Sequence, residues 1–177
     1  FLKILEATRC VGFDRYSWGY PFDWVTRNGT IKAGTPLITT TPYVYEAFAE
    51  IYEIDENPRW REIMRSIAEH AVQEIKDFPH GMDSFTCGYT PYDESGGVVN
   101  ASAYRALLLT KASKDLKEGH YWEIAKGNLN FVLEAQNEDG SWPYAVDGNR
   151  DFVDHFHTCF VLKALAKIEV LTGHEGC

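Results

Sequence analysis

Two segments of the sequence carry residue types that perform acid–base chemistry. The first holds Asp93 and Glu94, and the second holds Asp154, followed three residues later by His157. Two carboxylates, one from each segment, can hydrolyse a glycosidic bond if they flank it. In a second arrangement His157 transfers the proton and Asp154 orients it, which suits epimerisation or elimination at a uronic acid. Both arrangements make these four residues the candidate catalytic group.

A second group of residues combines aromatic rings with amide and carboxylate groups, which is the combination that a sugar requires. The C–H face of a sugar stacks on an aromatic ring, and its hydroxyl groups exchange hydrogen bonds with polar side chains. We therefore expect the following residues to bind the substrate: Tyr20, Asp23, Trp24, Tyr92, Asn100, Trp142 and Tyr144.

Most of these residues also have a structural interpretation. Asp23 and Asp93 follow prolines and can hydrogen-bond to nearby backbone N–H groups in a turn. Asp154 and Asn100 can cap the helices that begin beside them. The two tryptophans of the group can be packing anchors, and His157 can bond to a loop carbonyl. The sequence leaves both interpretations open for each residue.

The candidate residues lie in the connections of a repeat of about sixty residues. Aligning Ala47, Ala106 and Ala164 superimposes three helix starts, which are 59 and 58 residues apart. Each start has polar residues followed by an almost continuous apolar run, which predicts a helix buried on several sides. More amphipathic helices are predicted before them, over 59–77 and 120–136 and at the start of the chain, and aromatic–proline loops join each pair.

Helix pairs that repeat at this period form helical arrays. Buried inner helices with amphipathic outer helices favour a closed α/α toroid over an ordinary helical bundle. We therefore predict an all-α protein in which residues 1–177 form a single partial α/α-toroid domain. Three hairpins are half of the about six that close a ring, so a missing N-terminal half or a second copy would complete it. The abrupt start at Phe1 favours the missing half.

In such a toroid, all inner helices begin at the same end of the barrel, and the aromatic–proline loops arrive there too. The positive ends of the helix dipoles then converge around one funnel. We therefore expect the candidate catalytic and binding residues to gather at a single rim.

The composition excludes several classes of function. A chain of 177 residues with 45% hydrophobic and 14% aromatic residues can bury a core, which excludes disorder. A formal net charge of −9 without a basic cluster argues against nucleic acid as a partner. No apolar stretch is long enough to span a membrane. We expect no cofactor and no metal site and, because no signal peptide is present, a bacterial cytoplasmic protein.

Two motifs resemble those of known toroid families. Residues 136–142, Q-N-E-D-G-S-W, resemble the Q-x-x-x-G-x-W repeat signature of terpene cyclase and protein prenyltransferase toroids, which implies the same fold. Residues 154–160, D-H-F-H-T-C-F, resemble the segment that carries the zinc-binding histidine of prenyltransferase β subunits. In this chain Asn-Ala-Ser at 100–102 replaces the Asp-x-Cys pair of that site, and Asn and Ser are poor zinc ligands. The resemblance therefore implies a toroid without the prenyltransferase zinc site.

A longer resemblance covers nearly the whole chain. It rests on W-G-Y-P-F-D-W at 18–24, G-T-P at 34–36, V-N-A-S at 99–102, G-S-W-P-Y at 140–144 and D-H-F-H-T at 154–158. In this order these segments resemble the C-terminal half of toroid proteins found with bacterial exopolysaccharide biosynthesis genes. The resemblance implies a glycan context, with an oligo- or polysaccharide as the partner.

These observations favour a carbohydrate-active protein of bacterial polysaccharide metabolism, acting as a hydrolase, a lyase or an epimerase. One alternative is a non-catalytic glycan-binding or assembly component of an exopolysaccharide system, and another is an isoprenoid-handling toroid. Carboxylates paired across the mouth favour the enzyme. Aromatic residues without such a pair favour the binding component, and a deep apolar channel favours the isoprenoid toroid.

Overall fold

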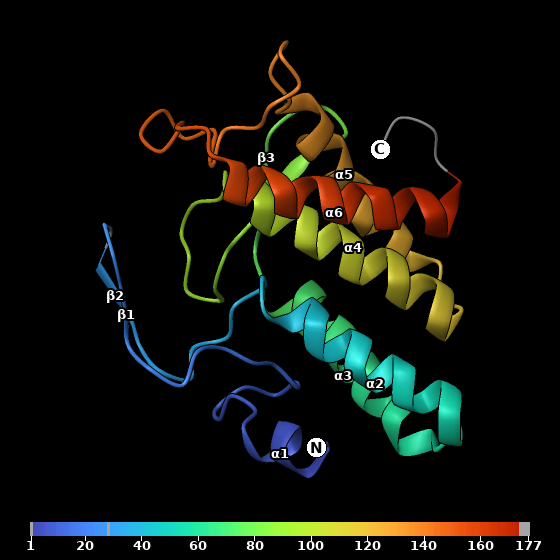
Figure 1. Cartoon of the computed structure of the whole chain (residues 1–177). Helices are drawn as coiled ribbons and strands as arrows, with labels where there is room; N and C mark the ends of the chain where they lie inside the picture. The colour runs from blue at the N-terminus through green and yellow to red at the C-terminus, as the bar shows by residue number, and fades with distance from the viewer. Residues whose placement is uncertain (1, 28, 174–177) are drawn as a thin grey trace.

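The computed structural model describes residues 2–27 and 29–173 of the chain (Figure 1). The helices within these ranges are α1 (Leu2–Ala7), α2 (Thr41–Asp55), α3 (Pro58–Gln73), α4 (Val99–Leu116), α5 (His120–Glu134) and α6 (His155–Thr172). The strands are β1 (Trp24–Thr26), β2 (Gly29–Ile31), β3 (Asp77–Pro79) and β4 (Phe85–Cys87). They form two antiparallel hairpins, β1–β2 and β3–β4.

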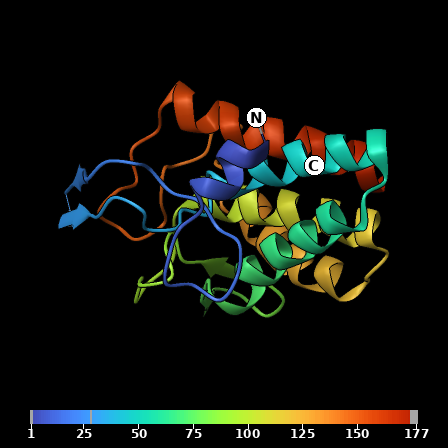
Figure 2. The same cartoon turned by 90° about the horizontal axis from the view of Figure 1, so that it is seen from below.

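Inner and outer helices alternate along the chain, as the repeat predicts. Figure 1 shows the inner helices α2, α4 and α6 running in the same direction. Figure 2 shows α4 in the middle, with α2 and α6 on one side of it and α3 and α5 on the other. In both views the β1–β2 hairpin and the segments that lead into α4 and α6 lie at the same end of the molecule. The predicted gathering of the connections at one end is therefore observed.

Helix α4 is the centre of the core. Every residue from 99 to 110 is buried, because other helices cover α4 on several sides. Some residues of α4 belong to a core cluster with Tyr45 of α2 and Ile67 of α3. Others belong to a second cluster with Phe131 of α5 and Ile168 of α6. The apolar run that begins with Val99 thus explains why α4 lies inside rather than at the surface.

A fully buried arginine ties four elements together beneath this core. The Nε of Arg105 in α4 donates to the carbonyl oxygen of Ala71 in α3 at 2.7 Å. One terminal nitrogen donates to Asp77 of β3 and also to the Oδ1 of Asn128 in α5, at 3.2 Å from the latter. Burying a guanidinium is costly unless it is paired, so these partners offset the cost of placing Arg105 in the interior.

The β hairpins are a difference from the sequence prediction, which extends an outer helix to Asp77. In the structure α3 ends at Gln73, and Asp77 begins β3. The N–H of Gly88 donates to the carbonyl oxygen of Lys76 at 2.9 Å, and Asp77 pairs with the buried Arg105. These partners are distant in the sequence, so helical periodicity alone does not reveal them.

Helix α6 forms an open edge of the array. Its buried residues are Val161, Ala164, Leu165 and Ile168, which belong to the core that packs on α4. Leu162 on another face is exposed to solvent. One covered face and one bare face are what we expect of a terminal helix in an incomplete ring.

Candidate functional site

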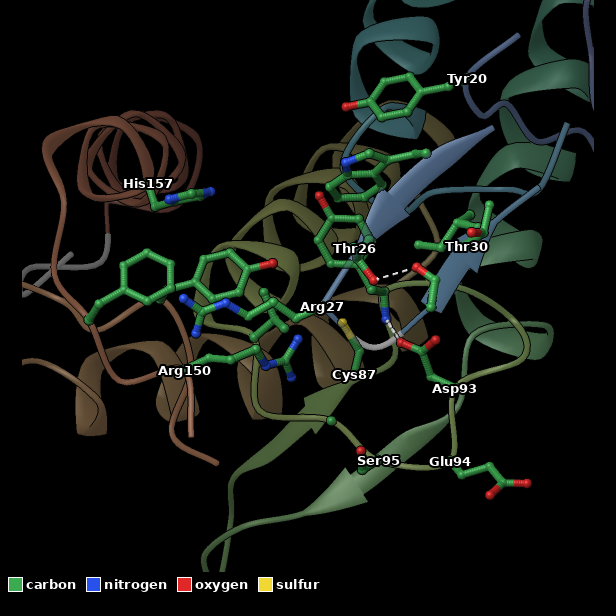
Figure 3. Close-up of a pocket in the computed structure, with 18 of the residues that line it drawn as sticks. Tyr20, Thr26, Arg27, Thr30, Cys87, Asp93, Glu94, Ser95, Arg150 and His157 are labelled. Carbon is green, nitrogen blue, oxygen red and sulfur yellow. Dashed lines mark hydrogen bonds between the residues drawn. The ribbon is translucent and has the colours of Figure 1, made fainter. Parts of the chain in front are cut away.

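A cavity of about 560 Å³ opens at the end of the molecule where the inner helices begin. Three stretches of the chain line it: the β1–β2 hairpin with Tyr20 before it, residues 87–98 between β4 and α4, and residues 144–157 before and within the first turn of α6 (Figure 3). Its lining includes six of the predicted site residues: Tyr20, Trp24, Asp93, Glu94, Tyr144 and His157.

Aromatic rings form two walls of this cavity. On one wall the rings of Tyr144 and Phe152 are stacked, with their centroids 5.1 Å apart and an interplanar angle of 7°. On the other wall Trp24 contacts Tyr20 and Tyr89, with centroid distances of 5.7 Å and 5.9 Å. Flat apolar faces with polar edges of this kind suit a ligand that has a C–H face and hydroxyl groups.

His157 is held at the first turn of α6 by Asp154. One carboxylate oxygen of Asp154 accepts the backbone N–H of His157 at 2.7 Å, which caps the helix. The other lies 2.6 Å from Nδ1 of the same residue. A carboxylate can only accept, so the proton of a neutral imidazole lies on Nδ1 and the lone pair on Nε2. The ring packs edge-on against Tyr144 at 4.5 Å between centroids, so it is part of the cavity wall.

The ionisation of Asp154 follows from the same contacts. Partial burial raises the pKa of its carboxyl group, but the hydrogen bonds from the backbone and side chain of His157 oppose this and hold the pKa below its ordinary value. Asp154 is therefore ionised at neutral pH and can stabilise a protonated His157. One carboxylate therefore both caps the helix and contacts the imidazole ring.

The other predicted acid, Asp93, is engaged in its own loop. One oxygen accepts the N–H of Tyr89 at 2.7 Å, and the other accepts the hydroxyl of Thr90 at 2.6 Å. Figure 3 shows the neighbouring Glu94 pointing away from the other lining side chains. The described lining therefore offers no free pair of carboxylates facing each other, and the turn interpretation of Asp93 is observed.

Asp23 and Tyr92 lie outside the lining of this cavity. The carboxylate of Asp23 accepts hydrogen bonds from the ammonium group of Lys32 at 2.8 Å and from the N–H of Ala33 at 2.9 Å. The side-chain hydrogen bond from Lys32 is the largest cause of a lowered pKa at Asp23. Tyr92 is 67% exposed and lines a smaller neighbouring cavity beside Phe13. The prediction that Asp23 and Tyr92 share one cavity with His157 is therefore not met, although both lie close to that cavity.

Asn100 and Trp142 correct the predicted list of binding residues. They are 4% and 3% exposed, respectively, and neither lines the cavity. The indole N–H of Trp142 donates to the carbonyl oxygen of Val132 at 2.8 Å, which makes it a packing anchor against α5. Asn100 lies within the buried first turn of α4, and its side chain does not cap that helix. Helix packing has covered both side chains.

Two arginines in the lining were missed by the sequence analysis. Arg150 precedes α6, and Arg27 follows β1 (Figure 3). The signals for their positions were present as turn residues, Asn-Gly at 28–29 and Asp-Gly-Asn at 147–149, which are typical of tight turns. These turns show that the arginines are near loop tips, but only the fold brings both tips to one cavity.

Cys87 is part of the lining, but burial raises the pKa of its thiol to about 11, so it stays protonated at neutral pH. Within residues 2–27 and 29–173, no three or more His, Cys, Asp or Glu side chains are grouped so that they could hold a metal ion. None of the helices that the structure describes is long and apolar enough to cross a membrane.

Comparisons by sequence give no relatives, because no family model and no curated protein matches the chain. Solved structures do match. Unsaturated glucuronyl hydrolase from Bacillus sp. GL1, responsible for the degradation of glycosaminoglycan, has a TM-score of 0.66 at 16% identity, over 99% of this chain and 48% of that chain. The GH76 α-mannanase BT2949 from Bacteroides thetaiotaomicron has a TM-score of 0.57 at 13% identity, over 88% of this chain and 47% of that chain.

These matches confirm the predicted fold class, an all-α chain arranged as part of an α/α toroid. The chain spans about half the length of either structure. Both neighbours are named as enzymes of carbohydrate breakdown, and at these identities the likeness extends to the fold alone. The resemblance to exopolysaccharide-cluster proteins is not tested by them and stays a prediction.

Proposed function

We propose that this chain provides a glycan-binding cleft of a carbohydrate-active α/α toroid, in which His157 is the acid–base group. The observation that carries the proposal is the Nδ1 contact with Asp154, which leaves Nε2 of His157 as the free nitrogen in a cavity walled by stacked aromatic rings. The carbohydrate names of the two structural neighbours agree with it.

One oriented histidine suits proton transfer at a sugar carbon. Nε2 removes the proton of a C–H bond that a neighbouring electron-withdrawing group has made acidic, and Asp154 stabilises the imidazolium that results. In an elimination, the electron pair of the C–H bond forms a C=C double bond, and the glycosidic oxygen leaves and takes a proton from water. In an epimerisation, water donates a proton to the opposite face of the same carbon, and the imidazolium releases its proton to the hydroxide that remains.

Hydrolysis by two carboxylates has less support. In that reaction one carboxyl group donates a proton and the other activates water or attacks the sugar. Asp93 and Asp154 each have both oxygens in hydrogen bonds to their own segment. The isoprenoid alternative is also weakened, because Arg27 and Arg150 line the cavity and a dry apolar channel would exclude them.

Solvent exchange at the sugar tests the proposal directly. The protein is incubated in D₂O with oligomers of bacterial polysaccharides, and NMR follows deuterium at ring carbons and the appearance of vinyl protons. We expect exchange with the wild type and a loss of about a hundredfold or more in rate for His157→Gln, with glycan binding retained. His155→Gln is the matched control, because His155 is exposed in the same turn and does not line the cavity.

A non-catalytic glycan-binding component is the second candidate, favoured by the engaged state of Asp93 and Asp154. It predicts that tryptophan emission changes when glycans bind, while no exchange and no product are seen. If none of the glycans binds or reacts, both candidates are excluded.

A further inference from the structure

We infer that the cleft selects a negatively charged sugar, whose anionic group binds to Arg27 and Arg150. This inference rests on the proposed function, because it names the class of glycan that would occupy the same cavity. It depends on the two arginines that line the cavity and on the contacts that their guanidinium groups already make. It also depends on the two acids of the lining, because Asp93 is engaged in its own loop and Glu94 points away from the other lining side chains.

Arg150 is held in place by one edge of its guanidinium group. Its Nε donates to a carboxylate oxygen of Asp147 at 2.7 Å, and its backbone N–H donates to the other at 2.8 Å. The guanidinium carbon lies 5.7 Å from the centroid of the Tyr144 ring. Within the described residues, the two terminal nitrogens make no hydrogen bond. They can therefore donate together to one carboxylate or sulfate group.

Arg27 reaches the cavity from the opposite wall, at the end of β1. In Figure 3 its side chain extends from the hairpin toward the part of the cavity where Arg150 lies. No ion pair of Arg27 is formed with any residue in 2–27 or 29–173. An exposed guanidinium without a carboxylate partner keeps its full charge for a ligand.

The acids of the lining do not cancel these charges. Asp93 is engaged by Tyr89 and Thr90, and Glu94 points away from the other lining side chains. The chain as a whole is acidic, with 17 basic and 26 acidic residues, so two arginines facing one cavity differ from the average of its surface. A neutral sugar would leave Arg27 without a charged partner and would offer no anionic group to the terminal nitrogens of Arg150, whose Nε alone is paired with Asp147.

The position of the arginines also fits the chemistry proposed for His157. The ring of Tyr144 links the two groups, since it contacts both His157 and Arg150. A sugar stacked on Tyr144 could place an anionic substituent at Arg150 while a ring carbon faces His157. A carboxyl group on the sugar would in addition make the neighbouring C–H bond more acidic, as proton removal requires.

Matched pairs of oligosaccharides test the inference. The probes are trimers to tetramers of galacturonate and mannuronate and glucuronate-containing oligomers, each beside its fully methyl-esterified form. Sulfated galactan oligomers form a third arm. Binding is measured by tryptophan emission and calorimetry at low and high salt. We expect the acids to bind about tenfold or more tighter than their esters, with a preference that shrinks as salt rises. The sulfated arm distinguishes a carboxylate site from a general anion site.

Variants then assign the effect to the two arginines. Arg27→Gln and Arg150→Gln should each weaken the acidic ligand about tenfold and leave the ester unchanged, and Arg150→Lys should restore part of the loss. The control is Arg9→Gln, because Arg9 packs over Tyr16 away from the cavity. Equal binding of acid and ester, unaffected by these variants, overturns the inference and leaves the proposed function standing. Binding of neither form overturns both.

Discussion

Two arginines of this chain, Arg105 and Arg150, illustrate two different uses of the same side chain. Arg105 lies fully buried in the middle of α4, with donors bound to α3, β3 and α5. Arg150 lies in the loop before α6 and uses only its Nε on Asp147. Arg105 connects α4 to three other elements of the core. Arg150 lines the cavity, and its terminal nitrogens are available to a ligand there. What separates a structural from a functional arginine here is which donors remain unbound at a surface that a ligand can reach.

The largest expected effect is on the deep arginine. Arg105→Met leaves the Ala71 carbonyl and the Asn128 side chain buried without their partner, so we expect the free energy of unfolding to fall by about 3 kcal/mol. Urea denaturation followed by circular dichroism measures it. Stability close to wild type would mean that the hydrogen bonds of Arg105 are dispensable, and it would contradict the structural role given to this arginine.

A smaller loss of folding stability is expected when a substitution disturbs the packing of α5 on β4 near Asn128 and leaves Arg105 in place. A Cβ at Gly127 would lie 1.9 Å from a ring carbon of Phe85, whose carbonyl oxygen accepts from Asn128. We expect Gly127→Ala to cost about 1–3 kcal/mol, because the ring must move. Gly119→Ala serves as the control, since nothing lies within 4 Å of a Cβ there. Equal thermal stability of the two variants would contradict the tight packing of α5 on β4.

At the rim, Asp154 combines stability with orientation of His157, and two substitutions separate these roles. Asp154→Ala removes the helix cap and should cost about 1 kcal/mol. Asp154→Asn keeps the cap, so it should retain most of the stability while losing the carboxylate that stabilises protonated His157. We therefore expect both variants to slow proton transfer and only the first to lower the melting temperature clearly. An active Asp154→Asn enzyme would contradict the orienting role.

The pH dependence of this pair has a definite sign. The pKa of Asp154 is lower in the folded chain than its ordinary value of 3.8, so its contribution to stability is present above that value and is lost as the pH falls through the folded pKa. The stability difference between wild type and Asp154→Ala should therefore shrink as the pH falls below the ordinary value of 3.8. Denaturation at a series of pH values below about 4 measures it, and a difference that stays constant over this acid range would exclude this ionisation.

The smallest effect on stability is expected at Arg150. Its partner Asp147 is near the surface, and pairs of this kind contribute little to stability. Arg150→Gln should change the free energy of unfolding by less than about 0.5 kcal/mol while weakening the binding of acidic glycans. A large loss of stability would place Arg150 in the same class as Arg105 and remove the contrast between them.

The sequence by itself determined the helices, their order and the end at which the connections lie. Apolar runs after polar starts and a period of about sixty residues are local properties of the chain. They predicted where α2, α4 and α6 begin and, apart from the extension to Asp77, the ranges of α3 and α5. The helix cap at Asp154 and the turn at Asp93 were also among the predicted interpretations, because both depend on neighbours close in the sequence.

Only the tertiary structure decided which polar side chains are covered and which reach the cavity. Asn100 and Trp142 look like site residues in the sequence, and helix packing buries them. Arg27 and Arg150 look like loop residues, and the fold brings them to one cavity with His157. Asp77 lies in a strand and pairs with the buried Arg105, where the sequence predicted the end of a helix. All of these outcomes depend on contacts between segments far apart in the chain, which residue type and local spacing do not encode.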